Sequence, residues 1–133
     1  MAKIKNEVTV KYTNKYIRHP FTIIIALAIL ITFSVAMIVP VEYIPLDTRY
    51  DKIQHASVFF ILTCAVATCL RVNHWLIGGC LVFFAIASEI VQDFLPYRSG
   101  SLEDLYADGI GIGLACLLIE LWVRIYVAFR TAR

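Results

Sequence analysis

The chain has 133 residues, of which 60% are hydrophobic and 17% charged; its formal net charge is +2 and its mean hydropathy is +0.77. A soluble domain is typically about 45–50% apolar and about 25% charged. The composition therefore excludes an ordinary soluble domain and predicts a membrane protein, for which we expect no nucleic-acid partner.

Four apolar segments follow one another, each close to the roughly 20 residues that a helix needs to cross a bilayer. They are Phe21–Val39, Ile53–Leu70, Trp75–Gln92 and Leu105–Val123. The sequence thus predicts an all-α integral membrane four-helix bundle over residues 21–127, with a basic juxtamembrane arm at residues 1–20 and a tail at residues 128–133. We expect the first segment to be retained, because its apolar run exceeds the ~7–15 residues of a signal-peptide core.

The basic residues are divided unevenly between the two predicted sides of the membrane. Nine of the twelve lysines and arginines lie in the amino-terminal arm, the turn after the second segment and the carboxyl-terminal tail. The other three are Arg49, Lys52 and Arg98. Since cytoplasmic loops carry an excess of Lys and Arg, both termini are predicted to lie in the cytoplasm.

The loop before the last segment ends in Ser101-Leu102-Glu103-Asp104. This pattern resembles a capping box, with Asp where Glu is usual, and predicts the start of the last helix. Within that helix, Gly109 and Gly113 have the spacing of small residues that lets two helices approach closely. We expect this pair to pack against another segment or to form the face of a homo-oligomer. Gly78 and Gly79 are expected to allow a similar approach in the third segment.

Three segments each contain one ionisable side chain about one helical turn from the same predicted boundary: His55, Glu89 and Asp108. Such groups are costly inside a membrane unless they have partners, so they mark candidate functional sites. Side chains three and four positions apart share a helix face. The faces expected to turn inward are Asp51 and His55; Gly78, Val82, Ala85, Glu89 and Gln92; and Asp104, Asp108, Gly111 and Ala115. In a compact bundle these faces meet in one polar pocket open to the outer leaflet.

The residue types in this predicted pocket are typical of two kinds of chemistry. Carboxylates and an imidazole bind divalent cations, and the candidate metal ligands are His55, Glu89, Asp104 and Asp108. Alternatively, His55 and Glu89 are catalytic and act as general base and acid.

Neighbouring residues are predicted to bind a substrate. A guanidinium fork and an ammonium group suit a phosphate or pyrophosphate, and Arg98 and Lys52 supply them. Gln92, Asp104 and Asp51 are expected beside them. A third interpretation is a structural network, in which these groups only pair with one another and fix the helix register.

Four short motifs occur in a fixed order within residues 40–118. They are Asp51-Lys52-Ile53-Gln54-His55; Glu89-Ile90-Val91-Gln92-Asp93-Phe94; Arg98-Ser99-Gly100-Ser101 followed by Asp104; and Asp108-Gly109-Ile110-Gly111. In these motifs the chain resembles the VanZ-like family of small bacterial membrane proteins, although Asp108 stands where the family usually has Asn. The resemblance implies a multi-pass protein of the bacterial inner membrane with a role in the cell envelope, since the founding member is associated with resistance to the glycopeptide antibiotic teicoplanin.

Three functions are compatible with these features. The first is an envelope protein that binds a lipid-linked cell-wall phosphate intermediate or modulates glycopeptide susceptibility. The second is a small intramembrane phospho- or pyrophosphohydrolase acting on a polyprenyl lipid. Both use the same residues, with a divalent cation as the candidate cofactor. A proton-coupled carrier is disfavoured, because Glu120 is the only charge expected deep in the cytoplasmic half of the bundle.

Overall fold

The computed structural model describes Ile17, residues 20–43 and residues 50–132. These residues form α2 (Pro20–Ile38), the 3-10 helix η1 (Val41–Tyr43), α3 (Asp51–Cys69), α4 (His74–Asp93) and α5 (Leu102–Thr131), and they contain no strand. The four α-helices are each long and apolar enough to cross a membrane. The predicted all-α, multi-pass membrane architecture is therefore confirmed over the described residues.

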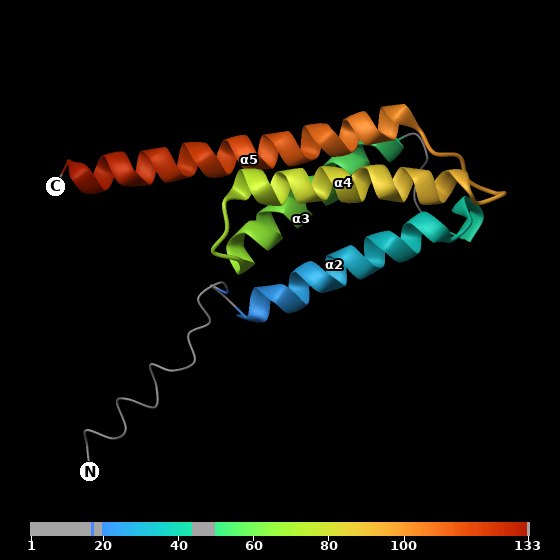
Figure 1. The fold of residues 1–133 in the computed structure, drawn as a ribbon, viewed down its shortest axis with the longest axis horizontal. Helices are drawn as coiled ribbons and strands as arrows, with labels where there is room; N and C mark the ends of the chain where they lie inside the picture. Colours follow the sequence, from blue (N-terminus) through green and yellow to red (C-terminus); the bar gives the residue numbers. More distant parts are fainter. Residues whose placement is uncertain (1–16, 18–19, 44–49, 133) are drawn as a thin grey trace, which may run out of the picture.

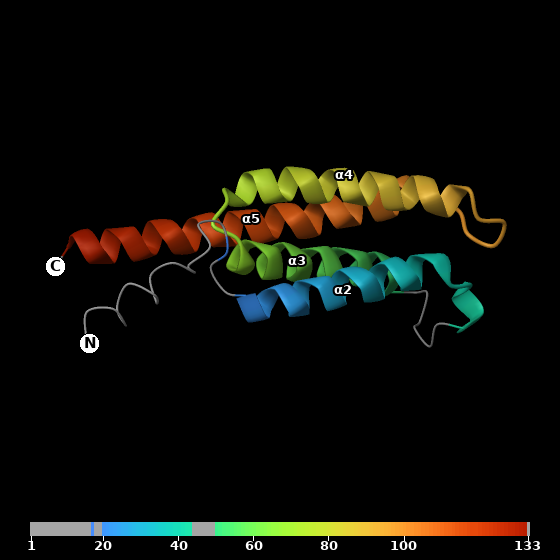
Figure 2. The ribbon, with the colours of Figure 1, turned by 60° about the horizontal axis from the view of Figure 1, so that its bottom comes forward.

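The helices form a bundle in which α3 lies centrally and contacts the other three (Figures 1 and 2). α2 and α4 run in one direction and α3 and α5 in the other. We call the end where α2 and α4 finish and where α3 and α5 begin the site end. α2 begins and α5 finishes at the opposite end, which agrees with the prediction that both termini lie on one side. That this side is the cytoplasm stays a prediction, and most of the predicted basic arm lies outside the described residues.

The predicted segments agree with α2, α3 and α4 to within two residues at each end. α5 is the exception, since it begins three residues before the predicted segment and ends eight residues after it. Its start is the predicted capping motif, where the Ser101 hydroxyl accepts the Asp104 N–H at 3.4 Å. Its far end continues through the predicted tail, because a helix that leaves the apolar layer stops only where the chain offers a stop signal, and Arg124 even pairs with Glu120 at 2.6 Å.

An apolar core holds the four helices together. It consists of Phe33, Met37, Phe59, Leu62, Ile77, Leu81, Ala85, Ile112 and Cys116. The rings of Phe33 on α2 and Phe59 on α3 meet edge to face, with centroids 5.1 Å apart. The same Phe33 ring meets His55 at 5.8 Å, so the apolar core ends directly against the candidate polar site.

Gly111 of α5 packs directly against the backbone of Ala56 on α3. A Cβ atom on Gly111 would lie 2.9 Å from the carbonyl carbon and 3.1 Å from the Cα of Ala56. Only a glycine allows α3 and α5 to pack this tightly. Gly78 likewise allows α4 to pack closely against α5, because a Cβ atom there would lie 2.9 Å from Sγ of Cys116. The neighbour in this case is a side chain rather than backbone.

The predicted packing of Gly109 and Gly113 inside the bundle is wrong. A Cβ atom on either residue would meet nothing among the described atoms within 4 Å, and the same holds for Gly79. Their spacing places them on one face of α5, but that face turns away from α3, whereas Gly111 turns toward it. A homo-oligomer formed through Gly109 and Gly113 stays a prediction.

Candidate functional site

His55 occupies the centre of the polar cluster at the site end. It lies on the second turn of α3 and is only 4% exposed. Its Nδ1 lies 3.0 Å from Oδ1 of Asp108 on α5. Because an ionised carboxylate only accepts, this contact places the ring hydrogen on Nδ1 and leaves Nε2 as an acceptor. The tight packing at Gly111, one turn further along α5, brings the two side chains within reach.

Asp108 is completely buried. Its Oδ1 takes the contact with His55, whereas its Oδ2 is buried and has no hydrogen-bond partner in the described part of the chain. A carboxylate oxygen in this position is an acceptor without a donor.

Glu89 brings α4 into the same cluster and is 7% exposed. Its Oε2 accepts the backbone N–H of Ser101 at 2.8 Å. Its Oε1 is buried and, like Oδ2 of Asp108, lacks a hydrogen-bond partner among the residues described. Ser101 also caps α5, so one residue joins the start of α5 to the last turn but one of α4.

The predicted convergence of these three side chains is confirmed. One ligand atom from each of His55, Glu89 and Asp108 lies within 4.8 Å of the others, and all three residues are buried. Glu89 faces the bundle interior rather than the lipid. One neighbour on its predicted face is misplaced, because Val82 is 38% exposed while Leu81, at 8%, fills the inward position.

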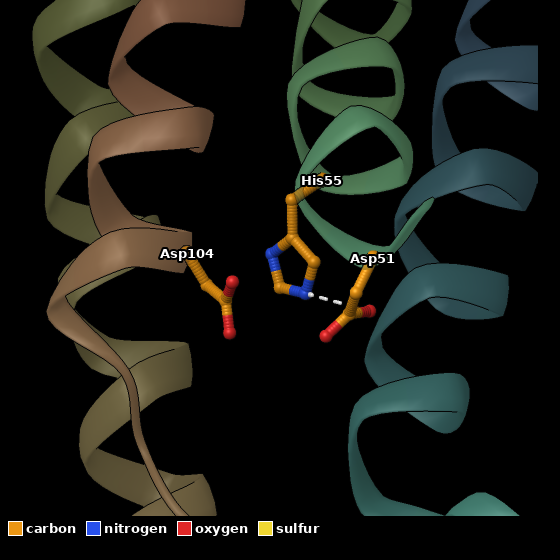
Figure 3. Close-up of side chains that lie close together, drawn as sticks. All are labelled: Asp51, His55 and Asp104. Atoms are coloured by element: carbon orange, nitrogen blue, oxygen red, sulfur yellow. Dashed lines mark ion pairs between the residues drawn. The ribbon is translucent and has the colours of Figure 1, made fainter. Parts of the chain in front are cut away.

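A second group shares His55 and lies nearer the end of the bundle. Figure 3 shows the imidazole between the carboxylates of Asp51 on α3 and Asp104 on α5, and the ligand atoms of these three residues also lie within 4.8 Å of one another. Nε2 of His55 is 3.9 Å from Oδ1 of Asp51, which is beyond hydrogen-bond distance. Both aspartates are half-buried, so this group connects the buried cluster with the surface.

Two predicted substrate-binding residues are directed elsewhere. Lys52 is exposed and forms an ion pair with Glu103 across the starts of α3 and α5. Gln92 is buried, and its Nε2 donates to Sδ of Met37 on α2 at 2.8 Å. Lys52 therefore lies at the rim of the site end, and Gln92 holds α2 against α4.

Arg98 caps the end of α2. Its Nη2 donates to the carbonyl oxygens of Ala36 at 2.7 Å and Val39 at 2.8 Å, and its Nε donates to Val39 at 3.2 Å. The last carbonyls of a helix lack donors within the helix, and a cation also suits the negative end of the helix dipole. The predicted role of Arg98 in anion binding stays a prediction, and any such role is shared with this cap.

Sequence reasoning missed two contributors to the site. The Ser101 amide was not foreseen as a donor to Glu89, because a backbone N–H leaves no signal beyond the capping motif. Phe33 was missed because α2 carries no ionisable residue, although its spacing of four from Met37 marks the inward face of that helix.

The opposite end of the bundle holds a separate polar contact. Nε2 of His74 lies 3.3 Å from Oε2 of Glu120, and Oε1 of Glu120 accepts from Arg124. This contact joins the start of α4 to α5, whereas His55 lies near the start of α3 at the other end of the bundle. Glu120 is thus engaged in pairing rather than isolated in the membrane.

Comparison with known proteins gives one relative. No protein-family model matches the chain, and no solved structure matches it. The chain is 33% identical over 103 residues to the uncharacterized protein C11E3.10 of Schizosaccharomyces pombe. The similarity covers 74% of this chain and 59% of the relative, so the chain spans less than two thirds of the yeast protein. The protein is thus a multi-pass membrane protein with a buried His–Glu–Asp cluster, similar to part of a fission-yeast protein.

Proposed function

We propose that this protein binds the phosphate group of a lipid headgroup at the site end of the bundle, as an envelope protein of the VanZ-like kind. The observation that carries the proposal is the pair of buried oxygens without hydrogen-bond partners in the described chain, Oε1 of Glu89 and Oδ2 of Asp108. A buried polar group left unpaired costs about 1–3 kcal/mol. A purely structural network would satisfy its own atoms, so the two leftover acceptors favour a bound proton donor or cation, through which the phosphate is held.

The position of the cluster suits a lipid headgroup. His55 lies four residues inside the start of α3, which corresponds to roughly 6 Å along the helix axis. α3 and α5 both begin at this end, and the free N–H groups and dipoles of helix starts attract anions. Lys52, which is paired with Glu103, lies at the rim beside them. A phosphate at the membrane boundary would meet these groups first.

The carboxylates constrain how the phosphate binds. Asp51, Glu89, Asp104 and Asp108 surround a single imidazole, and like charges repel an anion. The proposal therefore requires that protons or a cation neutralise the cluster when the phosphate is bound.

The yeast relative bears on the ligand class. Similarity to a fission-yeast protein supports a lipid that bacterial and eukaryotic membranes share over a ligand confined to bacterial cell walls. Polyprenyl phosphates form such a class, and they are also the lipid carriers implied by the envelope role of the VanZ-like family. From the resemblance to the VanZ-like family, we also propose a bacterial inner-membrane location and an effect on glycopeptide susceptibility.

Binding of a matched lipid pair tests the proposal. The purified full chain in detergent is titrated with a polyprenyl phosphate and with the polyprenol of the same length. We expect at least a tenfold preference for the phosphate. Glu89→Gln keeps the acceptor for the Ser101 N–H and removes the charge, and it should abolish the preference. Glu42→Gln makes the same change at an exposed position and should not. Equal binding of both lipids by the unmodified chain would falsify the proposal.

One contact favours a second candidate, a phosphohydrolase. A carboxylate that holds a histidine nitrogen orients the ring for proton transfer, and Asp108 lies 3.0 Å from Nδ1 of His55. In this case the protein releases inorganic phosphate from a polyprenyl diphosphate, and His55→Gln abolishes release while the lipid still binds. Binding without release leaves the first proposal in place.

A further inference from the structure

We infer that His55, Glu89 and Asp108 form a binding site for one divalent transition-metal cation, of the Zn²⁺ or Mn²⁺ class. The inference deepens the proposed function. It rests on that function only for the identity of the lipid that binds to the metal. The site itself follows from geometry, burial and charge.

The spacing of the ligand atoms suits a single ion. Zn²⁺ lies about 2.0–2.2 Å from nitrogen and oxygen ligands, so two ligands of one ion are separated by at most about 4.4 Å. The three ligand atoms all lie within 4.8 Å of one another. Shifts of a few tenths of an ångström in the ligand atoms therefore suffice to bring them to metal-binding distance. Each of the three residues comes from a different helix.

The two partnerless oxygens point to a missing positive charge. Oε1 of Glu89 and Oδ2 of Asp108 are buried without a hydrogen-bond partner in the structure as described, and their side chains are 7% and 0% exposed. Both oxygens are packed inside the bundle, where no donor of the described chain reaches them. Two carboxylates and a neutral imidazole carry a charge of −2, which one divalent cation balances. Glu89 and Asp108 supply these two charges.

The remaining atoms of the two carboxylates are held by the protein. The Ser101 N–H fixes Oε2 of Glu89, and His55 contacts Oδ1 of Asp108. Hydrogen bonds to metal-binding carboxylates and imidazoles orient them and strengthen binding. The ion replaces the proton on Nδ1 of His55, so this nitrogen binds the ion beside one oxygen of Asp108 and Oε1 of Glu89, while Oε2 of Glu89 stays anchored.

The half-buried pair Asp51 and Asp104 provides the route by which the ion enters. Their carboxylates flank His55 on the side of the bundle end (Figure 3). Negative charges at a site mouth raise the local concentration of cations.

The nitrogen ligand decides the class of cation. Mg²⁺ and Ca²⁺ prefer oxygen ligands, whereas imidazole suits Zn²⁺ and related transition metals. Three protein ligands also leave a coordination position open, as in catalytic zinc sites. A phosphate oxygen of the lipid fits that position, which explains how an acidic cluster binds an anion.

Metal binding is measured without any lipid. The purified full chain is stripped with a chelator and dialysed against Zn²⁺, Mn²⁺ or Co²⁺, and bound metal is counted by elemental mass spectrometry. We expect one equivalent per chain, with a Co²⁺ absorption spectrum that indicates a nitrogen ligand. Loss of an outer hydrogen-bonding partner alone typically weakens metal binding about 10–100-fold. Glu89→Gln and Asp108→Asn should therefore weaken binding at least 100-fold, whereas Glu103→Gln should not change it.

Folding controls keep the result interpretable. Both amide variants are close in shape to the parent residues, and each must retain the helical circular dichroism and the elution volume of the unmodified chain. If a variant fails this check, His55→Gln replaces it. Unchanged stoichiometry in folded Glu89→Gln means that the ion binds without Glu89, and no bound metal in the unmodified chain means that the cluster holds no ion. Either result overturns the inference. Loss of binding in Asp104→Asn with full binding in Asp108→Asn moves the ion to the outer group and also overturns it.

The lipid experiment separates this inference from the proposed function. If the chain binds metal but shows no preference for polyprenyl phosphate over polyprenol, the metal site stands and the lipid function fails. If it prefers the phosphate equally in excess chelator, the lipid function stands and the metal inference fails.

Discussion

The contact between Gly111 and Ala56 makes Gly111→Ala the most informative substitution for the packing of the site. A Cβ atom at position 111 would lie 2.9 Å from the carbonyl carbon of Ala56. An ordinary contact is at least about 3.4 Å, and the atom in the way is backbone. The carbonyl oxygen of Ala56 lies closer still, so the added methyl group pushes α3 and α5 apart by about 1 Å at this level.

The energetic cost follows from two opposing effects. Overpacking in a well-packed interior costs about 1–3 kcal/mol, while replacing glycine by alanine within a helix returns up to about 1 kcal/mol. We expect a net loss of about 1–2 kcal/mol. His55 adjoins Ala56, and Asp108 precedes Gly111 by one turn. The same displacement stretches their 3.0 Å contact to about 4 Å, beyond hydrogen-bond distance.

The assay compares Gly111→Ala with two matched variants. Gly109→Ala and Gly113→Ala introduce the same methyl group on the open face of α5, where it meets nothing described within 4 Å. Equilibrium unfolding in mixed micelles should show Gly111→Ala destabilised and the other two unchanged or more stable. Metal and lipid binding should weaken in Gly111→Ala alone. If all three variants have the same stability, the close approach of α3 and α5 is refuted.

Three further predictions test the surroundings of the site. Arg98→Lys loses the fork that reaches two carbonyls of α2. It should destabilise the protein by about 1.5–3 kcal/mol, the range for hydrogen bonds to charged groups, as measured by the unfolding midpoint; an unchanged midpoint argues against the cap. Ser101→Ala removes the hydroxyl cap of α5 but keeps the N–H to Glu89, so unfolding should become easier by about 0.5–1 kcal/mol while lipid preference is retained. Reporter fusions at residues 73 and 100 should report cytoplasm and exterior, respectively, and the reverse pattern overturns the predicted orientation.

The sequence was sufficient for the parts of the fold that hydropathy alone determines. Three helices were placed almost to the residue, and shared depth was enough to predict that His55, Glu89 and Asp108 meet. Depth carries this information because ionisable groups in apolar helices can be satisfied only by one another or by a ligand.

Other features depend on rotation about the helix axis and on backbone groups, which hydropathy does not encode. The glycine pair at 109 and 113 has the expected spacing, yet Gly111 between them faces α3. Arg98 was predicted from its charge to bind an anion, whereas its geometry is determined by the open carbonyls of α2. The extension of α5 beyond its apolar segment was missed because the prediction ended the helix where the membrane was expected to end.

The length of α5 has a consequence for how the protein sits in bilayers of different thickness. Its 30 residues correspond to roughly 45 Å, the full thickness of a bilayer with its headgroups, whereas the 19 residues of α3 match the ~30 Å hydrocarbon layer alone. From Leu102 at the site end, Trp122 lies roughly 30 Å away, so Trp122 and Tyr126 reach the far headgroup layer together with Arg124 and Arg130. Aromatic and basic residues anchor a helix at that level. The anchored end of α5 therefore sets the depth of His55 in the membrane. In a thicker bilayer the cluster would lie deeper in the hydrocarbon layer, and in a thinner one it would be exposed to water.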